Sequence, residues 1–191
     1  MITKPKDYEQ LKNSFETLNA GGHKCVIMEA KESKDSNGRD ILVVSFDTAN
    51  DDTQPKYLSN LYIKDTRPDK KWSYSGQRTF WVDSELFESN LSKLVGAIEK
   101  SNPDVQIWNK DVLDLAKLKG LKIGIVFGID EYIKEDHSLG ASCKPRYFCG
   151  YDDAFEQKIP DRKKAKPRTE SPTDFGFVNV AEDDEAGLPF K

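Results

Sequence analysis

The sequence predicts a mostly β protein with added helices, and three observations lead to this fold class. Two short β-prone runs flank a polar turn between residues 21 and 47. A third apolar run, LKIGIVFGI, covers residues 121–129. Between these regions, residues 86–98 carry apolar side chains every three or four positions, which is the period of an amphipathic helix. Strands therefore make up most of the regular structure that the sequence predicts.

The first two predicted strands form a β-hairpin. Val26, Met28 and Ala30 alternate with their neighbours at the period of two that is typical of a strand with one face toward a core. Residues 41–47, ILVVSFD, are β-branched and too short for a buried helix. The connection at residues 32–39 contains Asn-Gly, a pair suited to a tight turn. We therefore predict a hairpin with a charged tip.

One helix and one strand are predicted on either side of this hairpin. Apolar side chains in residues 1–20 recur at spacings of three and four, so a short amphipathic helix is predicted there, ending at Gly21 and Gly22. Residues 56–64, KYLSNLYIK, alternate in the manner of a strand and predict strand three.

The second half of the chain is predicted to hold a helix followed by two strands. The helix begins after Asp83 or Ser84, either of which can cap it, and ends before Pro103. The other predicted segments are a short β-prone piece at 77–83, a short helix at 111–119, strand four at 121–129, a long polar connection at 130–144 and strand five at 146–151.

The predicted order of three strands, a helix and two strands matches the five-stranded Greek-key barrel called the OB-fold, with its helix between strands three and four. In that fold, strands two and three and the loops joining strands one-two and four-five form the binding face. Other small barrels and α+β sheets give the same order, and the sequence alone leaves them open.

Charge divides the chain into three parts. Residues 158–168 hold six basic residues and one acidic residue, whereas residues 169–191 hold six acidic and one basic. The charged content of the whole chain is high, at 32%, and its hydrophobic content of 37% is low, which indicates that part of it does not fold. We predict an OB-fold domain at 1–157, a basic linker at 158–168 and a disordered acidic tail at 169–191.

Several classes of protein are disfavoured by composition. The sequence has no apolar run of 18 residues and no apolar signal region at its start, so a soluble intracellular protein is expected. The three cysteines lack a CxxC pair, which makes a disulfide framework improbable. His137, Cys143 and Cys149 do not have the spacing of zinc ligands, so neither a metal nor another cofactor is expected.

Binding of a single nucleic-acid strand needs cations that follow the phosphates and flat rings on which bases stack. The segment DTRPDKKWSYSGQRTFW, residues 65–81, interleaves both kinds of side chain. Further candidates lie on the first loop, on predicted strand three and around the fourth-fifth loop. The full set of candidate nucleic-acid-binding residues is Lys31, Lys34, Arg39, Lys56, Tyr62, Lys64, Arg67, Lys70, Lys71, Trp72, Tyr74, Arg78, Trp81, Lys144, Arg146 and Tyr147.

The end of the chain, EDDEAGLPFK, predicts a partner-binding segment. A disordered acidic segment with an apolar tip can insert its ring into a pocket while its carboxylates meet a basic rim. The candidate partner-binding residues are Asp183, Asp184, Glu185, Leu188, Pro189 and Phe190. Because the tail and the basic linker have opposite net charge, we also expect the tail to compete with DNA for the binding groove.

The chain resembles bacterial single-stranded DNA-binding proteins, whose acidic tails end in Pro-Phe, and more closely the similar proteins of phages that infect Gram-positive bacteria. The resemblance rests on GGHKCVIMEAKESKDSNGRDILVVSFD, LKGLKIGIVFGIDEY, KPRYFCGYDD and the Pro-Phe tip. It implies cooperative, sequence-independent coating of single strands in phage DNA replication or recombination, in the cytoplasm of a bacterial host. It implies that the tail recruits replication or recombination proteins, and it leaves the homo-oligomeric state open. In this chain Lys191 follows Phe190, whereas the familiar tip ends on Phe.

Two other functions remain as alternatives. A metal-dependent nuclease could use Asp130, Glu131, Glu135 and Asp136 as oxygen ligands for magnesium, although they cluster in a loop without a basic partner on a neighbouring strand. A protein-interaction adaptor that never touches nucleic acid fits the body's net charge, which is −4 when the linker and tail are left out. Because no phosphate-binding glycine loop, nucleophile elbow or HExxH motif is present, we expect a protein without enzymatic activity.

Overall fold

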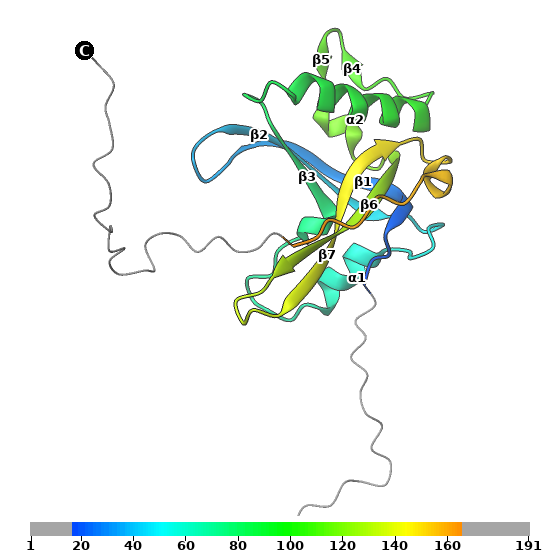
Figure 1. Cartoon of the computed structure of the whole chain (residues 1–191). Coiled ribbons are helices and arrows are strands. Elements are labelled where there is room, and N and C mark those ends of the chain that lie inside the picture. Colours follow the sequence, from blue (N-terminus) through cyan, green and yellow to red (C-terminus); the bar gives the residue numbers. More distant parts are fainter. Residues whose placement is uncertain (1–16, 166–191) are drawn as a thin grey trace, which may run out of the picture.

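The computed structural model describes residues 17–165, which form a mostly β fold with two α-helices (Figure 1). Five strands make one antiparallel sheet in the spatial order β3-β2-β1-β6-β7. In chain order the elements are β1 (Gly21–Lys34), β2 (Asp40–Thr48), α1 (Tyr57–Lys64), β3 (Gln77–Trp81), α2 (Phe87–Ser101), β4 (Trp108–Asn109), β5 (Val112–Leu113), β6 (Lys122–Ile133) and β7 (Leu139–Cys149). Three short 3₁₀ helices accompany them: η1 (Tyr74–Gly76), η2 (Leu115–Leu118) and η3 (Ala154–Glu156).

The sheet is open and does not close into the predicted barrel. Among the described strands, β3 and β7 are the two edges and do not pair with each other. Side chains link this edge to β7 instead: Ser75 of η1, which precedes β3, donates its Oγ–H to the Cys143 carbonyl at 2.5 Å, and Phe80 of β3 stacks on Phe148 with ring centroids 6.2 Å apart. One reason is that Pro145 lies in β7 and has no N–H with which to pair a neighbouring strand.

The predicted hairpin of β1 and β2 is confirmed. Cys25 and Ile27 lie in the core, and a bulge between Ile27 and Glu29 shifts the register, so that Ala30 packs against the core next. The polarity pattern on its own could not show this change of face. At the tip, the Asp35 carboxylate accepts the backbone N–H groups of residues 37 and 39, which fixes the turn.

The predicted third strand at 56–64 is wrong, because this segment is the helix α1. The buried Asp47 carboxylate accepts the N–H groups of Leu58 at 2.9 Å and Ser59 at 3.1 Å, and Thr48 Oγ1 accepts that of Tyr57 at 2.8 Å. Side chains at the end of β2 therefore cap the helix from outside it. The third strand of the sheet is β3, from the segment predicted only as a short β-prone piece.

Two predictions in the second half of the chain also need correction. The expected helix at 111–119 is the small β4–β5 hairpin followed by η2. The expected polar connection at 130–144 is mostly strand, because β6 and β7 continue to a turn at residues 134–138. This part of the hairpin extends beyond the core, so its residues lack the apolar pattern on which the prediction depended. The helix expected in residues 1–20 falls almost wholly outside the described part of the chain.

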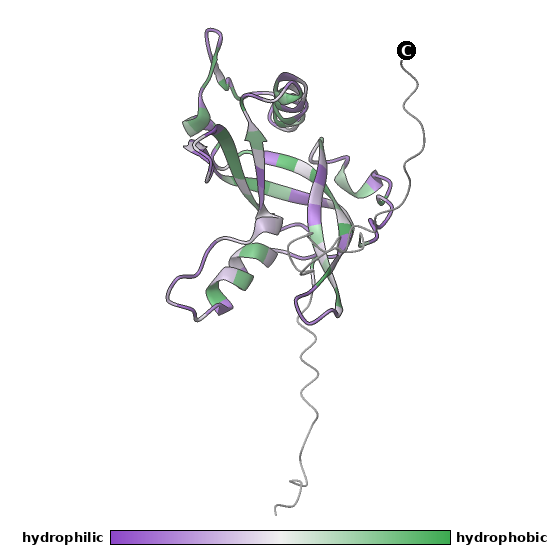
Figure 2. Cartoon of the chain, turned by 60° about the vertical axis from the view of Figure 1, so that its left-hand side comes forward, coloured by the Kyte–Doolittle hydropathy of each residue, from purple (hydrophilic) through white to green (hydrophobic). Residues whose placement is uncertain are grey.

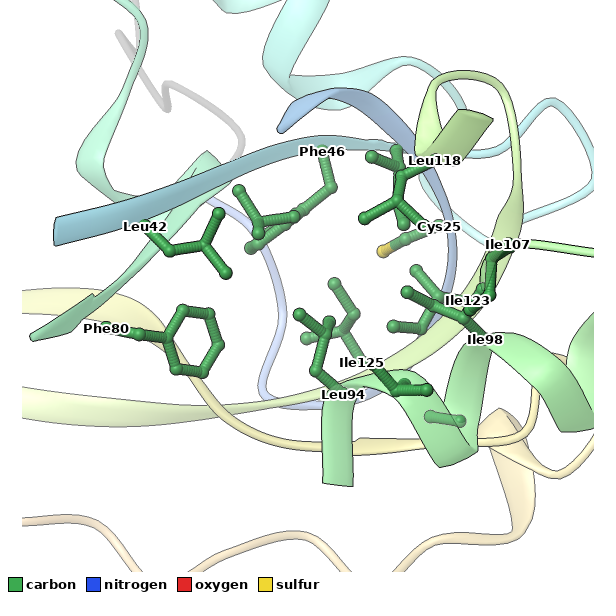
Figure 3. Packing of buried hydrophobic residues seen from close by; sticks show 14 of the residues in the cluster. Cys25, Leu42, Phe46, Phe80, Leu94, Ile98, Ile107, Leu118, Ile123 and Ile125 are labelled. Atoms are coloured by element: carbon green, nitrogen blue, oxygen red, sulfur yellow. The ribbon is translucent and has the colours of Figure 1, made fainter. Parts of the chain in front are cut away.

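The helix α2, predicted from its apolar stripe, packs on the sheet and contributes to the hydrophobic core. Figure 3 shows Leu94 and Ile98 of α2 pointing toward Ile123 and Ile125 of β6. Phe46 of β2 lies in the same cluster. All five side chains are almost fully buried, and burial of a side chain of this size contributes about 1.5–3 kcal/mol. No helix in residues 17–165 is long and apolar enough to cross a membrane.

Part of the predicted basic linker lies against the sheet. Lys163 accepts the N–H of Glu131 through its carbonyl and donates its own N–H to the Ile129 carbonyl, each at 2.9 Å. Asp130 and Lys163 thereby form a parallel bridge, and Arg162 forms an ion pair with Glu131 at 3.1 Å. We call residues 158–165 the basic strap. Figure 1 shows this orange segment crossing β6 and β7.

Candidate nucleic-acid interface

A hollow of about 570 Å³ lies between α1 and the loop that follows it. We call it the α1 pocket. Figure 2 shows α1 and its hydrophilic loop projecting from the sheet at the lower left. The aromatic residues that line it are Tyr62, Trp72 and Tyr74, and the cations that line it are Lys64, Arg67 and Lys71. The structure thus brings six of the predicted nucleic-acid-binding residues to one place.

Trp72 forms the fixed wall of the α1 pocket. Its indole N–H donates to the Gly76 carbonyl at 2.9 Å, and its ring packs against the core. A Cβ on residue 76 would lie 2.4 Å from the indole nitrogen and 3.2 Å from the Phe46 carbonyl oxygen, so this close approach requires glycine. Tyr62 lies against Trp72 with ring centroids 5.9 Å apart. The two rings are therefore positioned before any ligand arrives.

Lys70 lies beside this wall, with its Nζ 4.6 Å from the centre of the Tyr62 ring. A cation at this distance over an aromatic face is attracted to the ring. Lys70 is thus held near the α1 pocket, although it is not among the lining residues.

Arg67 and Asp65 form an ion pair with each other in the α1 pocket. Arg67 Nε lies 2.9 Å and 3.1 Å from the two carboxylate oxygens, and Nη2 lies 2.7 Å from one of them. These side-chain hydrogen bonds, with that of the Arg67 backbone N–H, lower the pKa of Asp65 to about 2. Arg67 is exposed and Asp65 is partly buried, and the charge of Arg67 is already offset locally by its partner.

Three exposed side chains of the α1 pocket remain available to a ligand. Tyr74 is 81% exposed. Lys64 and Lys71 form no ion pair with any residue of the described part of the chain. Residues 56–81 hold six basic residues against two acidic ones, a local net charge of +4 on a chain whose total is −4. The surface around the pocket therefore favours an anionic polymer.

The candidates at the hairpin tip lie elsewhere and have internal partners. Lys31 pairs with Glu29 at 3.0 Å, Lys34 with Asp40 at 2.6 Å, and Arg39 with Asp35 at 2.7 Å. Trp81 donates its indole N–H to Asp35 at 3.3 Å, and Arg39 lies over its ring at 5.9 Å. Residues 29–40 contain three basic and four acidic residues, so the tip has no excess positive charge.

The candidates on β7 also differ from one another. Lys144 is exposed and forms no ion pair with another described residue. Arg146 is mostly buried, forms an ion pair with Asp130, and has an Nε atom without a hydrogen-bond partner within residues 17–165. Tyr147 donates its hydroxyl to the Lys158 carbonyl at 3.1 Å. Of these three, Lys144 is the one whose side chain is left for a ligand.

The last two candidates, Lys56 and Arg78, lie at the start of α1 and at the open edge of the sheet. Lys56 precedes α1 with a left-handed backbone, at φ 49°, and its side chain is exposed. Arg78 reaches across the open edge of the sheet to the Pro145 carbonyl at 3.4 Å. The predicted partner-binding residues of the tail, from Asp183 to Phe190, lie outside the described residues.

Three of the four carboxylates proposed for a nuclease are engaged in structural contacts. Asp130 pairs with Arg146, Glu131 pairs with Arg162, and Asp136 accepts from Ser138 Oγ at 2.6 Å. Within residues 17–165, no group of three or more His, Cys, Asp or Glu side chains is placed to hold a metal ion. Burial raises the pKa of Cys143 and of Cys149 to about 11, which keeps both thiols protonated near neutral pH.

Sequence reasoning missed two groups that line the α1 pocket. Leu61 lies in the segment predicted as strand three, although Leu58, Leu61 and Tyr62 also have the spacing of three and four that is typical of a helix face. Asp69 lies within the predicted segment 65–81, but an acidic side chain is not part of a pattern of cations and rings. No family model matches this chain, and no curated protein matches it either.

Proposed function

We propose that this chain is a nonenzymatic OB-fold protein that binds single-stranded DNA independently of sequence in phage DNA replication or recombination. The strand order β3-β2-β1-β6-β7, with α2 between the third and fourth strands along the chain, supports an OB-type fold. In this proposal the barrel is left open between β3 and β7, and side chains close the gap.

The observation that carries the proposal is the α1 pocket. It combines preformed aromatic walls with exposed lysines that no carboxylate of the described chain neutralises. Stacking of a base on an aromatic ring contributes about 1–3 kcal/mol, and each phosphate contact adds a salt-dependent attraction. A duplex hides its base faces, so rings in a hollow favour a single strand.

The direct test is fluorescence anisotropy of a labelled poly-dT strand, titrated with the full chain at two salt concentrations and with duplex competitor. We expect binding that weakens as the salt concentration rises, that duplex competitor does not displace, and that quenches tryptophan fluorescence. Quenching should persist after Trp81→Phe and Trp108→Phe, which leave Trp72 as the remaining tryptophan. Absence of binding at low salt would refute the proposal and favour the alternative hypothesis, a protein-interaction adaptor.

The role proposed for the tail is recruitment of replication or recombination proteins, with competition for the DNA surface as a second effect. Residues 169–191 carry a net charge of −5, and residues 56–81 carry +4. Deletion of residues 169–191 should therefore tighten DNA binding several-fold at low salt and have little effect at high salt. Unchanged affinity at low salt would contradict the competition.

A further inference from the structure

The α1 pocket contains a feature that simple phosphate binding does not explain. Two carboxylates, Asp65 and Asp69, line the same hollow as the lysines and the rings. Carboxylates repel phosphates, so a hollow built only for the DNA backbone would gain affinity without them. A nucleobase differs, because it carries N–H groups that a carboxylate can accept.

The two carboxylates differ in whether another side chain already binds them. Arg67 occupies both oxygens of Asp65 through three hydrogen bonds. Asp69 is exposed and makes no hydrogen bond or ion pair with another residue of the described chain, and its charge acts on Arg67 at longer range. Asp69 is therefore the acceptor that remains available inside the hollow.

The aromatic walls limit what can approach Asp69. Tyr62 and Trp72 are held against each other, and the Trp72 indole N–H is already used by Gly76. Trp72 therefore has no N–H left to donate to a base, and hydrogen bonds to a base fall to the other polar groups that line the pocket. The volume of about 570 Å³ is in the range of sites that hold a small ligand such as a nucleoside.

We propose that the α1 pocket takes one unstacked base of the bound strand and that Asp69 accepts a hydrogen bond from its exocyclic amino group. Cytosine offers its N4 amino group to such an acceptor. Thymine has a carbonyl oxygen at the corresponding position, which a carboxylate repels. Lys64 and Lys71 at the same hollow then contact the neighbouring phosphates. The protein would thus prefer amino-bearing bases over thymine while still coating any sequence.

This inference rests on the proposed function, and one titration separates the two. Labelled dC and dT strands of equal length are titrated with the full chain at pH 7.5 and constant salt. We expect the dC strand to bind about five-fold more tightly, at the lower end of the discrimination that a base contact gives. If neither strand binds, the proposed function fails; if both bind equally, only the role of Asp69 fails.

The decisive variant is Asp69→Ala, with Asp111→Ala as its matched control. Asp111 is also exposed and forms no hydrogen bond or ion pair with another described residue, but it lies in the β4–β5 turn. We expect Asp69→Ala to abolish the preference and Asp111→Ala to retain it. An equal gain in affinity for both strands in Asp69→Ala would mean that Asp69 only repels phosphates, and it would overturn the proposal. Circular dichroism of each variant confirms that the fold is retained.

Discussion

The α1 pocket and the β1–β2 hairpin tip are built from the same kinds of side chain and differ in what those side chains contact. Both combine lysine or arginine with tryptophan. At the tip, each of the three candidate cations has a carboxylate within 3.0 Å, and the Trp81 indole N–H has a carboxylate partner too. In the α1 pocket, Lys64, Lys71 and Tyr74 have no such partner in the described chain. Composition therefore shows basic residues and a tryptophan in both regions, whereas the ion pairs of the basic residues distinguish one region from the other.

The largest effect on the α1 pocket is expected from removing the side-chain cap of α1. Asp47→Ala leaves the buried N–H of Leu58 and the partly buried N–H of Ser59 without their acceptor. Unsatisfied buried donors cost about 1–3 kcal/mol each, so we expect the free energy of unfolding to fall by about 2–3 kcal/mol. DNA affinity should fall with it, because α1 carries Tyr62 and Lys64. Urea denaturation measures the change in stability.

The matched control at the hairpin is Asp40→Ala. Asp40 is exposed and pairs with the exposed Lys34, so its loss should change stability by less than about 1 kcal/mol. If the two variants lost equal stability, the capping role of Asp47 would be wrong.

The next largest effect is expected from the rings. Tyr74→Ala should weaken binding of a single strand by about 1–3 kcal/mol, the contribution of one stacked base. Trp81→Ala should cost less, although Trp81 is 43% exposed, because Arg39 and Asp35 already contact it. Tyr74→Phe keeps the ring and should bind nearly as well as the original chain. Anisotropy titrations give the three affinities, and a larger loss at Trp81 would reverse the ranking of the two regions.

A smaller and more specific effect is expected from the cations. The pair Lys64→Ala and Lys71→Ala removes two phosphate contacts, which should reduce the slope of log affinity against log salt by about 1.4. The pair Lys31→Ala and Lys34→Ala should leave the slope nearly unchanged, because both lysines already have carboxylate partners. Titrations at several salt concentrations measure the slopes. Equal changes in the two double variants would show that the internal ion pairs open when DNA binds.

The sequence predicted well those elements whose signal is local. The β1–β2 hairpin, α2 and β6 each have an apolar pattern of the correct period in their own residues. The helix α1 was mistaken for a strand because its start is fixed by Asp47 and Thr48, which belong to β2. A window of eight residues does not contain that information. The open edge between β3 and β7 depends on Pro145 and on contacts between distant residues, and no local pattern reports such contacts.

The candidate residues show the same limit. The basic and aromatic run at 65–81 was found from its composition, and the structure gathers much of it around the α1 pocket. Arg146 and Lys144 looked equivalent in the sequence, yet Arg146 pairs with Asp130 across the β6–β7 ladder and Lys144 does not. Which cation is neutralised depends on the register of the two strands, so composition could not separate the two.

The smallest predicted effect concerns two partly buried carboxylates that form ion pairs with arginines, one in each region. The side-chain hydrogen bonds of Arg67 lower the pKa of Asp65 from 3.8 to about 2. For Asp35, desolvation raises the pKa, but the hydrogen bonds of Arg39, Asn37 and Trp81 lower it from 3.8 to about 2 overall. A carboxyl whose pKa is lower in the folded state stabilises the fold above about pH 4, and this contribution is lost as the pH falls from about 4 toward 2.

These two carboxylates allow the regions to be separated by titration. Arg67→Ala should raise the pKa of Asp65 toward 3.8 and leave that of Asp35 unchanged, whereas Arg39→Ala should do the reverse. Each rise should stop short of 3.8, because the backbone N–H groups of residues 67 and 39 still donate to these carboxylates. Carbon-detected NMR titration of the side-chain carboxyls between pH 1.5 and pH 6 measures both values in one sample. A shift at both sites in either variant would mean that the α1 pocket and the hairpin tip are electrostatically coupled, contrary to their separate sets of ion pairs.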